Sequence, residues 1–340
     1  MSEHETGAAG AGFGACLVRP RRRWLLAVAA FMVAATSAGA LAQAYPVKPL
    51  RMLVGAPPGG TTDIVARVIA QKLGERLGQT VVVENRAGAG GNIGMDGVAK
   101  AAPDGYTFGM AYSGLSINPS VMTMPFDTLR DLAPVSLVAT VPMFLIVDPA
   151  TQVTSVKELI DRAKANPGKL AIAATSFAAV SHLSAELLKQ RAGIDMTTVV
   201  YKGSAPAWVD VMGGRVAAMF DTVAGVLPHV KSGKMRAIAV GGSKRMAWLP
   251  EVPTLVESGL PDFEIRSWYG VIAPAKTPPE IIERVSREIA DIVKTAELRE
   301  NFSAQMLDPV GGSPAEFGEF IRAEMRLWEP VAKSAKIRME

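Results

Sequence analysis

Hydrophobic and polar positions follow two different periods along most of this chain. Short apolar runs at residues 51–54 and 81–84 have the pattern of buried strands. Between them, apolar side chains recur every three or four residues from Ile64 to Leu73, and Gly74 and Gly78 close the segment, as at the end of a helix. The same alternation continues downstream, and it predicts an α/β fold with parallel-rich sheets flanked by helices.

Further elements follow from the same patterns and from local stop and start signals. We expect strands near 106–110, 170–174, 198–201, 215–220 and 235–240, with helices near 181–191 and 205–212. Capping boxes, in which a Ser or Thr precedes a Glu by three positions, open helices at Ser155, Thr277 and Ser313. The last two also carry Pro at the first helical position.

Two apolar segments share one plan and predict crossings between two lobes. Residues 141–149 and 268–274 each form an apolar strand, end in X-Pro and lead into a capped helix. We therefore expect lobe 1 to comprise residues 45–146 and 270–340, and lobe 2 to comprise residues 147–269. Each lobe would hold a sheet flanked by helices.

The first 44 residues have the pattern of an export signal. Four arginines between Arg19 and Arg23 precede an apolar run at 24–35, and Ala42-Gln43-Ala44 is a small-x-small cleavage site, so the mature chain is expected to begin at Tyr45. A twin-arginine signal and a misplaced start codon remain open. The single cysteine, Cys16, leaves with this segment, and export without cysteine fits a bacterial periplasm. No later apolar run reaches 18 residues, so we expect a soluble mature protein.

Charge and motifs exclude several classes of protein. The net charge of +4 falls to +2 without the signal, and no basic stripe is interleaved with aromatic residues, which argues against nucleic-acid binding. The mature chain has only His182 and His229 as histidines, and it lacks the common hydrolase motifs. Neither the dinucleotide fingerprint nor a metal-ligand cluster is present. We therefore expect no cofactor, no metal and no catalytic residue.

The loops that follow the strands carry the candidate chemistry. Ligands of open α/β sheets bind beyond the carboxyl ends of the strands, and helix N-termini there favour anions. The predicted ligand-binding residues are Ala56, Gly59, Gly60, Thr61, Thr62, Asp63 and Ser113 in the first lobe, and Ser176, Phe177, Ser181, Ser204, Ala205 and Asp221 in the second. Asp63 would repel a carboxylate, so we expect it to hold a water, an amine or the loop itself.

The chain also resembles the Bug-type receptors, the extracytoplasmic solute-binding proteins of tripartite tricarboxylate transporters. The matching motifs, which span nearly the whole mature chain, are Tyr45-Pro46-x-Lys48-Pro49, Pro57-Pro58-Gly59-Gly60 with Asp63, 83–94, Pro103-Asp104-Gly105-Tyr106, Ser181-His182-Leu183, 201–206, Met219-Phe220-Asp221 and 249–254. The resemblance implies a two-lobed Venus-flytrap fold that binds small carboxylates without catalysis, largely through backbone amides, hydroxyls and water.

Two loops depart from the family pattern. Gly55-Ala56 stand where the family commonly has Pro-Phe, and residues 176–180 read Ser-Phe-Ala-Ala-Val where Gly-Asn-Gly-Thr-Thr is usual. One aromatic is lost from one rim and Phe177 is gained on the other. We expect a reshaped pocket with fewer hydroxyl donors, suited to a ligand with an apolar or aromatic part.

The main hypothesis is a monomeric periplasmic receptor that presents a small organic acid to membrane transporter subunits. Two alternatives stay open. One is a secreted α/β enzyme that uses Asp63 or Asp221 as a base. The other is a ligand sensor for a signalling partner, which differs from a transport receptor only in that partner.

Overall fold

The computed structural model describes residues 45–246 and 249–339. The predicted signal segment, residues 1–44, lies outside them. Residues from Lys48 onward form one compact unit, separate from the N-terminal unit that ends at Val47.

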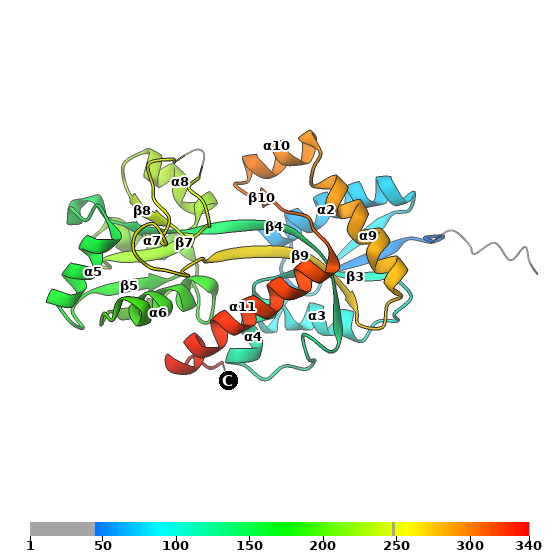
Figure 1. Cartoon of the computed structure of the whole chain (residues 1–340), viewed down its shortest axis with the longest axis horizontal. Coiled ribbons are helices and arrows are strands. Elements are labelled where there is room, and N and C mark those ends of the chain that lie inside the picture. Colours follow the sequence, from blue (N-terminus) through cyan, green and yellow to red (C-terminus); the bar gives the residue numbers. More distant parts are fainter. Residues whose placement is uncertain (1–44, 247–248, 340) are drawn as a thin grey trace, which may run out of the picture. The chain divides into compact units, whose positions relative to one another are not determined.

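One ten-stranded sheet runs through this unit, and its two regions are joined by the long strand β4 (Leu132–Val147), which pairs with neighbours in both (Figure 1). The strands are β1 (Leu50–Val54), β2 (Val81–Asn85), β3 (Thr107–Tyr112), β4 (Leu132–Val147), β5 (Ala171–Ala174), β6 (Thr197–Val200), β7 (Ala218–Thr222), β8 (Arg236–Val240), β9 (Arg266–Pro274) and β10 (Asp308–Pro309). The order is β2-β1-β3-β9-β4-β7-β5-β6, with β8 and β10 also paired to β4. We call the region containing β1 to β3 the first lobe and the region containing β5 to β8 the second lobe.

Parallel and antiparallel pairing divide along this order. β1 pairs in parallel with β2 and β3, and β5 pairs in parallel with β6 and β7. The crossing strands β4 and β9 run antiparallel to each other and to their lobe neighbours. The sheets are therefore parallel-rich in each lobe, with an antiparallel pair between the lobes.

Helices cover both faces of the sheet regions (Figure 1). They are α2 (Thr61–Leu77), α3 (Asn92–Ala99), α4 (Gly114–Val121), α5 (Val156–Ala165), α6 (Val180–Ala192), α7 (Ser204–Met212), α8 (Val223–Lys231), α9 (Pro279–Ile292), α10 (Ala296–Ala304) and α11 (Pro314–Ser334), with short 3₁₀ turns η1 (Ala89–Gly91) and η2 (Pro149–Thr151). α11 contacts α4 and β4, and it also contacts α6 of the second lobe.

The predicted strands and helices are present close to their expected positions, but one of the three predicted capping boxes is wrong. Ser313 and Glu316 form the full reciprocal box at the start of α11, and Ser155 accepts from Glu158 N at the start of α5. The N-cap residue of α9 is Pro278 and not the predicted Thr277, so the helix begins one residue later than predicted. Pro278 precedes Pro279, and a residue before proline is disfavoured in helical conformation, so Pro278 cannot be the first helical residue.

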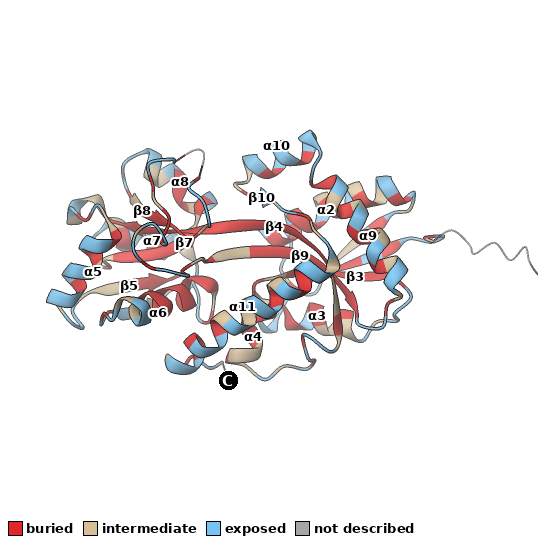
Figure 2. Cartoon of the chain, in the orientation of Figure 1, coloured by how far each residue is buried: buried red, intermediate tan, exposed pale blue. Residues whose placement is uncertain are grey.

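Two apolar clusters form the core, one in the first lobe and one that extends from the second lobe to α4 and α11. In the first lobe, Leu53, Val98 and Ile272 belong to a buried cluster that includes Trp268 and Phe317. The second-lobe cluster also contains residues from the end of α11 and beyond, namely Trp328, Val331, Ala332 and Ile337. Figure 2 shows β4 buried where it runs between the lobes, and β9 buried except at its first two residues, which are half-buried. The crossing strands are thus part of the core, and the end of the chain packs with the second lobe.

Candidate functional site

A cavity of about 470 Å³ lies where the two lobes meet, and we call it the cleft. The first lobe contributes the end of β3 and the start of α4, together with Thr62 and Gly90. The second lobe contributes residues 175–181 and the end of β7, and the crossing strands contribute Met143 and residues 267–269. Its walls are therefore mainly the strand-end loops that the sequence predicted.

Six of the thirteen predicted residues line the cleft. They are Thr62, Ser113, Ser176, Phe177, Ser181 and Asp221. The other seven, which are Ala56, Gly59, Gly60, Thr61, Asp63, Ser204 and Ala205, are not among the residues that line it. Ser204 and Ala205 begin α7, and Ser204 hydrogen-bonds to Asp221. Thr61 begins α2 and hydrogen-bonds to Tyr269 in the cleft wall.

Ser113 fixes the first-lobe side of the cleft. Its side-chain oxygen accepts a hydrogen bond from Trp268 N at 3.0 Å, which joins the end of β3 to the crossing strand β9. The Ser113 O–H remains a donor, because a hydroxyl both donates and accepts. Ser113 is also the residue before α4, whose first N–H groups have no partner within the helix. Together they present hydrogen-bond donors at this wall.

The loop from Thr175 to Ser181 forms the opposite wall. Thr175 N donates to the Ser181 side-chain oxygen at 3.0 Å, and the two hydroxyls lie 2.7 Å apart. Ala178 N donates to His182 Nδ1 at 3.1 Å. Burial lowers the pKa of His182, so its imidazole is neutral near pH 7. The loop is held in place by side chains of α6, and the N-terminus of α6 faces the cleft with its unpaired N–H groups.

Asp221 is the one residue with a formal charge among those lining the cleft in the described part of the chain. It is 5% exposed, and its carboxylate accepts from Trp208 Nε1 at 2.8 Å and from Thr222 N at 2.7 Å. Burial raises the pKa of Asp221 in spite of these hydrogen bonds. The carboxylate therefore links β7 to α7 across the side of the cleft.

Asp63 holds the glycine loop, which is one of the three roles that its charge predicted. Its carboxylate accepts from Gly59 N and Arg67 Nε at 2.9 Å and from Asn85 Nδ2 at 2.8 Å. The hydrogen bond from Arg67, followed by those from Gly59 and Asn85, lowers the pKa of Asp63 to about 2 against the opposing effect of burial. Asn85 Nδ2 also donates to Ala56 O. Ala56, Gly59 and Gly60 thus belong to a loop that Asp63 and Asn85 fasten to the first lobe.

A second glycine-rich loop, residues 88–94, packs closely against the end of β1 in the first lobe. A Cβ added to Gly94 would lie 2.7 Å from Gly55 Cα, and one added to Gly55 would lie 2.5 Å from Gly91 O. Only glycine allows the start of α3 to approach the end of β1 this closely. Gly90 alone of this loop lines the cleft, next to Asn118, whose Nδ2 donates to Gly90 O at 2.9 Å.

Several cleft residues were not predicted. Tyr112 ends β3 and Asn118 lies in α4, on either side of Ser113. Their closeness to a strand end was the one signal in the sequence that could have predicted them. Met143 and Trp268 lie on the crossing strands, which the sequence placed between the lobes without placing them in the site. Met339, whose N–H donates to Val121 O, reaches the cleft from the far end of the chain, and no local pattern indicates it.

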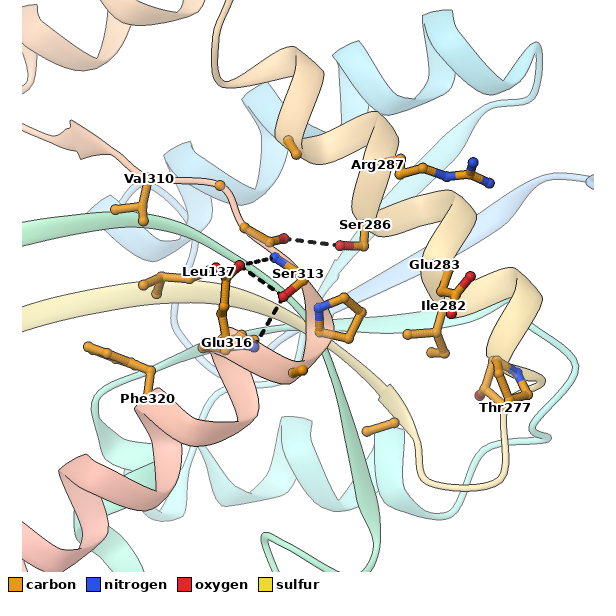
Figure 3. A pocket seen from close by; sticks show the side chains of 18 of the residues that line it. Leu137, Thr277, Ile282, Glu283, Ser286, Arg287, Val310, Ser313, Glu316 and Phe320 are labelled. Carbon is orange, nitrogen blue, oxygen red and sulfur yellow. Dashed lines mark hydrogen bonds between the residues drawn. The ribbon is translucent and has the colours of Figure 1, made fainter.

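A larger cavity of about 1180 Å³ lies away from the cleft, between α9 and the start of α11 (Figure 3). None of the predicted ligand-binding residues lines it. Some of its polar side chains are engaged locally: Ser286 donates to Gly312 O, and Ser313 and Glu316 bond each other in the capping box, whereas the buried Thr277 hydroxyl has no partner. A groove that none of the predicted ligand-binding residues lines is a weaker candidate than the cleft, where donors from both lobes meet.

Other kinds of site have no support in the described residues. Residues 45–246 and 249–339 contain no group of three or more His, Cys, Asp or Glu side chains that could hold a metal ion. No helix in this part of the chain has both the length and the apolar character that a membrane span requires.

The fold and the cleft define a solute receptor with two lobes. Residues 65–337 match the model of the tripartite tricarboxylate transporter family receptor, and the chain belongs to that family. It is 41% identical to Protein BugT of Bordetella pertussis, over 93% of this chain and 98% of that protein. Receptors of this family are periplasmic binding proteins that work with membrane transporter subunits.

Two solved structures show such receptors with carboxylates bound. The R. palustris protein Rpa4515, solved with adipate, is 37% identical with a TM-score of 0.72, covering 86% of this chain and 99% of that one. MatC from Rhodopseudomonas palustris, solved with malate, is 28% identical with a TM-score of 0.68, covering 84% of this chain and 99% of that one. Both of these similar proteins therefore hold a small carboxylate in the same fold.

Proposed function

We propose that the cleft captures a small carboxylate in the periplasm and releases it unchanged to transporter membrane subunits. The observation that carries this proposal is the set of donors facing one another: the Ser113 hydroxyl and the start of α4 on one wall, and the start of α6 on the other. Unpaired N–H groups at two helix N-termini favour a bound anion. The adipate and malate bound by the two relatives have the matching chemistry.

The proposed contacts are the residues of the cleft wall. Ser113, Ser181 and Thr62 supply hydroxyls, and Ser176, Phe177 and Asp221 shape the side opposite Ser113. Ala56, Gly59, Gly60, Thr61 and Asp63 position the first-lobe loop, while Ser204 and Ala205 start α7 beside Asp221. The proposed lobe boundaries are 45–146 with 270–340, and 147–269. The chain is proposed to act as a monomer and to be cleaved after Ala44.

Asp63, the first of the two bases in the enzyme hypothesis, is not suited to that role. Asp63 is ion-paired with Arg67 and its pKa is lowered to about 2, so it is a poor proton acceptor near neutral pH. Asp221 is engaged by Trp208 and the Thr222 backbone, and neither histidine is bonded to it. We therefore propose that the protein is not an enzyme. A sensor would use the same cleft and differ only in its partner.

Isothermal titration of the purified protein with malate, adipate, citrate, hexanoate and phenylacetate tests this function. At least one acid should bind, and NMR of the released ligand should show it chemically unchanged. Ser113→Ala should weaken binding by about 1.5–3 kcal/mol, the usual value of a hydrogen bond to a charged group. The matched control, Ser232→Ala on the exposed end of α8, should leave binding unchanged. Failure of every acid to bind, or conversion of one to product, would refute the proposal.

A further inference from the structure

Phe177 leaves an aromatic ring partly uncovered at the ligand cleft. The residue follows β5 and lines the cleft, and it is 42% exposed. A large aromatic side chain gains most of its stabilisation by burial, and this ring is only half covered by the protein itself. The cleft is therefore open to a ligand group that completes the burial.

The ring is held by its surroundings and is ready to accept such a group. Its centroid lies 5.2 Å from that of the His182 ring, in a tilted arrangement. The next residue, Ala178, has φ +56°, in the left-handed region that residues other than glycine rarely adopt, and its N–H is bonded to His182 Nδ1. A ring fixed in this way costs little conformational entropy when a ligand packs on it.

The rest of the cleft favours an apolar ligand body over a second anionic group. Apolar side chains line its walls: Ile117, Met143 and Trp268 are buried there, and Met339 is half-buried. The lining residues in the described part of the chain include no Lys or Arg, and the one formal charge among them, Asp221, is negative. A ligand with several carboxylates would thus meet a like charge and no counter-ion, while a single carboxylate is served by Ser113 and the helix starts.

We propose that Phe177 determines the ligand class: a monocarboxylate whose apolar or aromatic body covers the Phe177 ring. The inference rests on the proposed function, because the carboxylate is assigned to the donors around Ser113. It adds the nature of the remainder of the ligand and the residue that recognises it. The ligand then touches both lobes, with its charge on one wall and its apolar face on the other.

Acids that differ in their apolar part and in their number of carboxylates test the contribution of each end of the ligand to binding. We would titrate phenylacetate, hexanoate, malate and citrate into the wild-type protein and into Phe177→Ala, Phe177→Leu and Leu129→Ala. Leu129 is 49% exposed but lies outside the cleft, so Leu129→Ala controls for loss of an exposed apolar side chain. Circular dichroism and thermal unfolding without ligand establish that each variant is folded.

The wild-type protein should bind phenylacetate at least about tenfold more tightly than citrate or malate. Phe177→Ala should weaken phenylacetate about tenfold while malate changes by no more than about twofold, and Phe177→Leu should fall between. Leu129→Ala should match the wild type. An unchanged phenylacetate affinity in Phe177→Ala, or a wild-type preference for citrate, would overturn this inference and leave the receptor function standing. Absence of binding by all four acids would overturn both.

Discussion

The buried carboxylate of Asp63 gives the sharpest test of how the first lobe is held together. The residue is 3% exposed and sits in the first turn of α2, where the helix dipole favours a negative charge. It accepts hydrogen bonds from Gly59, Arg67 and Asn85. Asp63→Asn removes the charge and replaces one acceptor oxygen by an NH2 group, which faces hydrogen-bond donors, so the loop loses its anchor.

The size of the effect follows from the pKa. A fall from 3.8 to about 2 corresponds to about 2.5 kcal/mol of unfolding free energy, at about 1.4 kcal/mol per pKa unit. Because the folded pKa is depressed, this stabilisation is fully present above the unfolded value near 4 and is lost as the pH falls through about 2. We therefore expect Asp63→Asn to be less stable by about 2.5 kcal/mol at pH 7, with a shrinking difference below pH 4.

Urea unfolding followed by circular dichroism at pH 7, 5, 3.5 and 2.5 measures this difference directly. Asp161→Asn on α5 is the matched control, since Asp161 forms an exposed ion pair with Lys157 and such pairs contribute little. Its stability should stay within about 0.5 kcal/mol of the wild type at pH 7. If the deficit of Asp63→Asn were the same at pH 7 and at pH 2.5, the charge would not be its cause, and the reasoning would fail.

Three further predictions concern stability and can be measured by the same unfolding assay. Ser313→Ala should lower the unfolding free energy by about 1 kcal/mol because it breaks the capping box. Thr277→Val should leave it unchanged because the buried Thr277 hydroxyl has no partner. Equal losses in the two variants would contradict this contrast. Gly270→Ala should cost about 1–3 kcal/mol, since its Cβ would lie 2.2 Å from Phe317 Cζ, and a neutral result would show that the Phe317 ring moves freely. Burial lowers the folded pKa of His182, so wild-type stability should fall relative to His182→Gln as the pH drops from 7.5 to 5; a difference independent of pH would rule out this titration.

Local patterns predicted most of the fold, and about half of the predicted ligand-binding residues line the cleft. Ser113 and Ser181 each lie where a strand leads into a helix. Residues nearby in the sequence determine such a position, so both could be predicted, and both line the cleft. Met143 and Met339 were missed because their positions depend on strand pairing and on packing of the chain's last helix, which no local period encodes.

The error at Thr277 has a different origin, because the sequence held the information. Thr-Pro-Pro-Glu and Ser-Pro-Ala-Glu have the same capping spacing, but only the second has a helical residue after its cap. The second proline of the first motif forces Pro278 into an extended conformation, with ψ 133°, and moves the helix start. A rule for the residue before proline would have separated the two motifs.

The pairing of β4 with β9 restricts how the two lobes can move. Nine residue pairs join these strands from Leu132–Pro274 to Pro142–Arg266. Sliding one strand past the other by a single residue would turn every side chain to the opposite face and expose the apolar core, so the register between the two crossing strands is fixed. The motion that keeps this register is a bending of both strands together. Opening the receptor should therefore be a rotation about one axis, and distances between labels on the two lobes should change together.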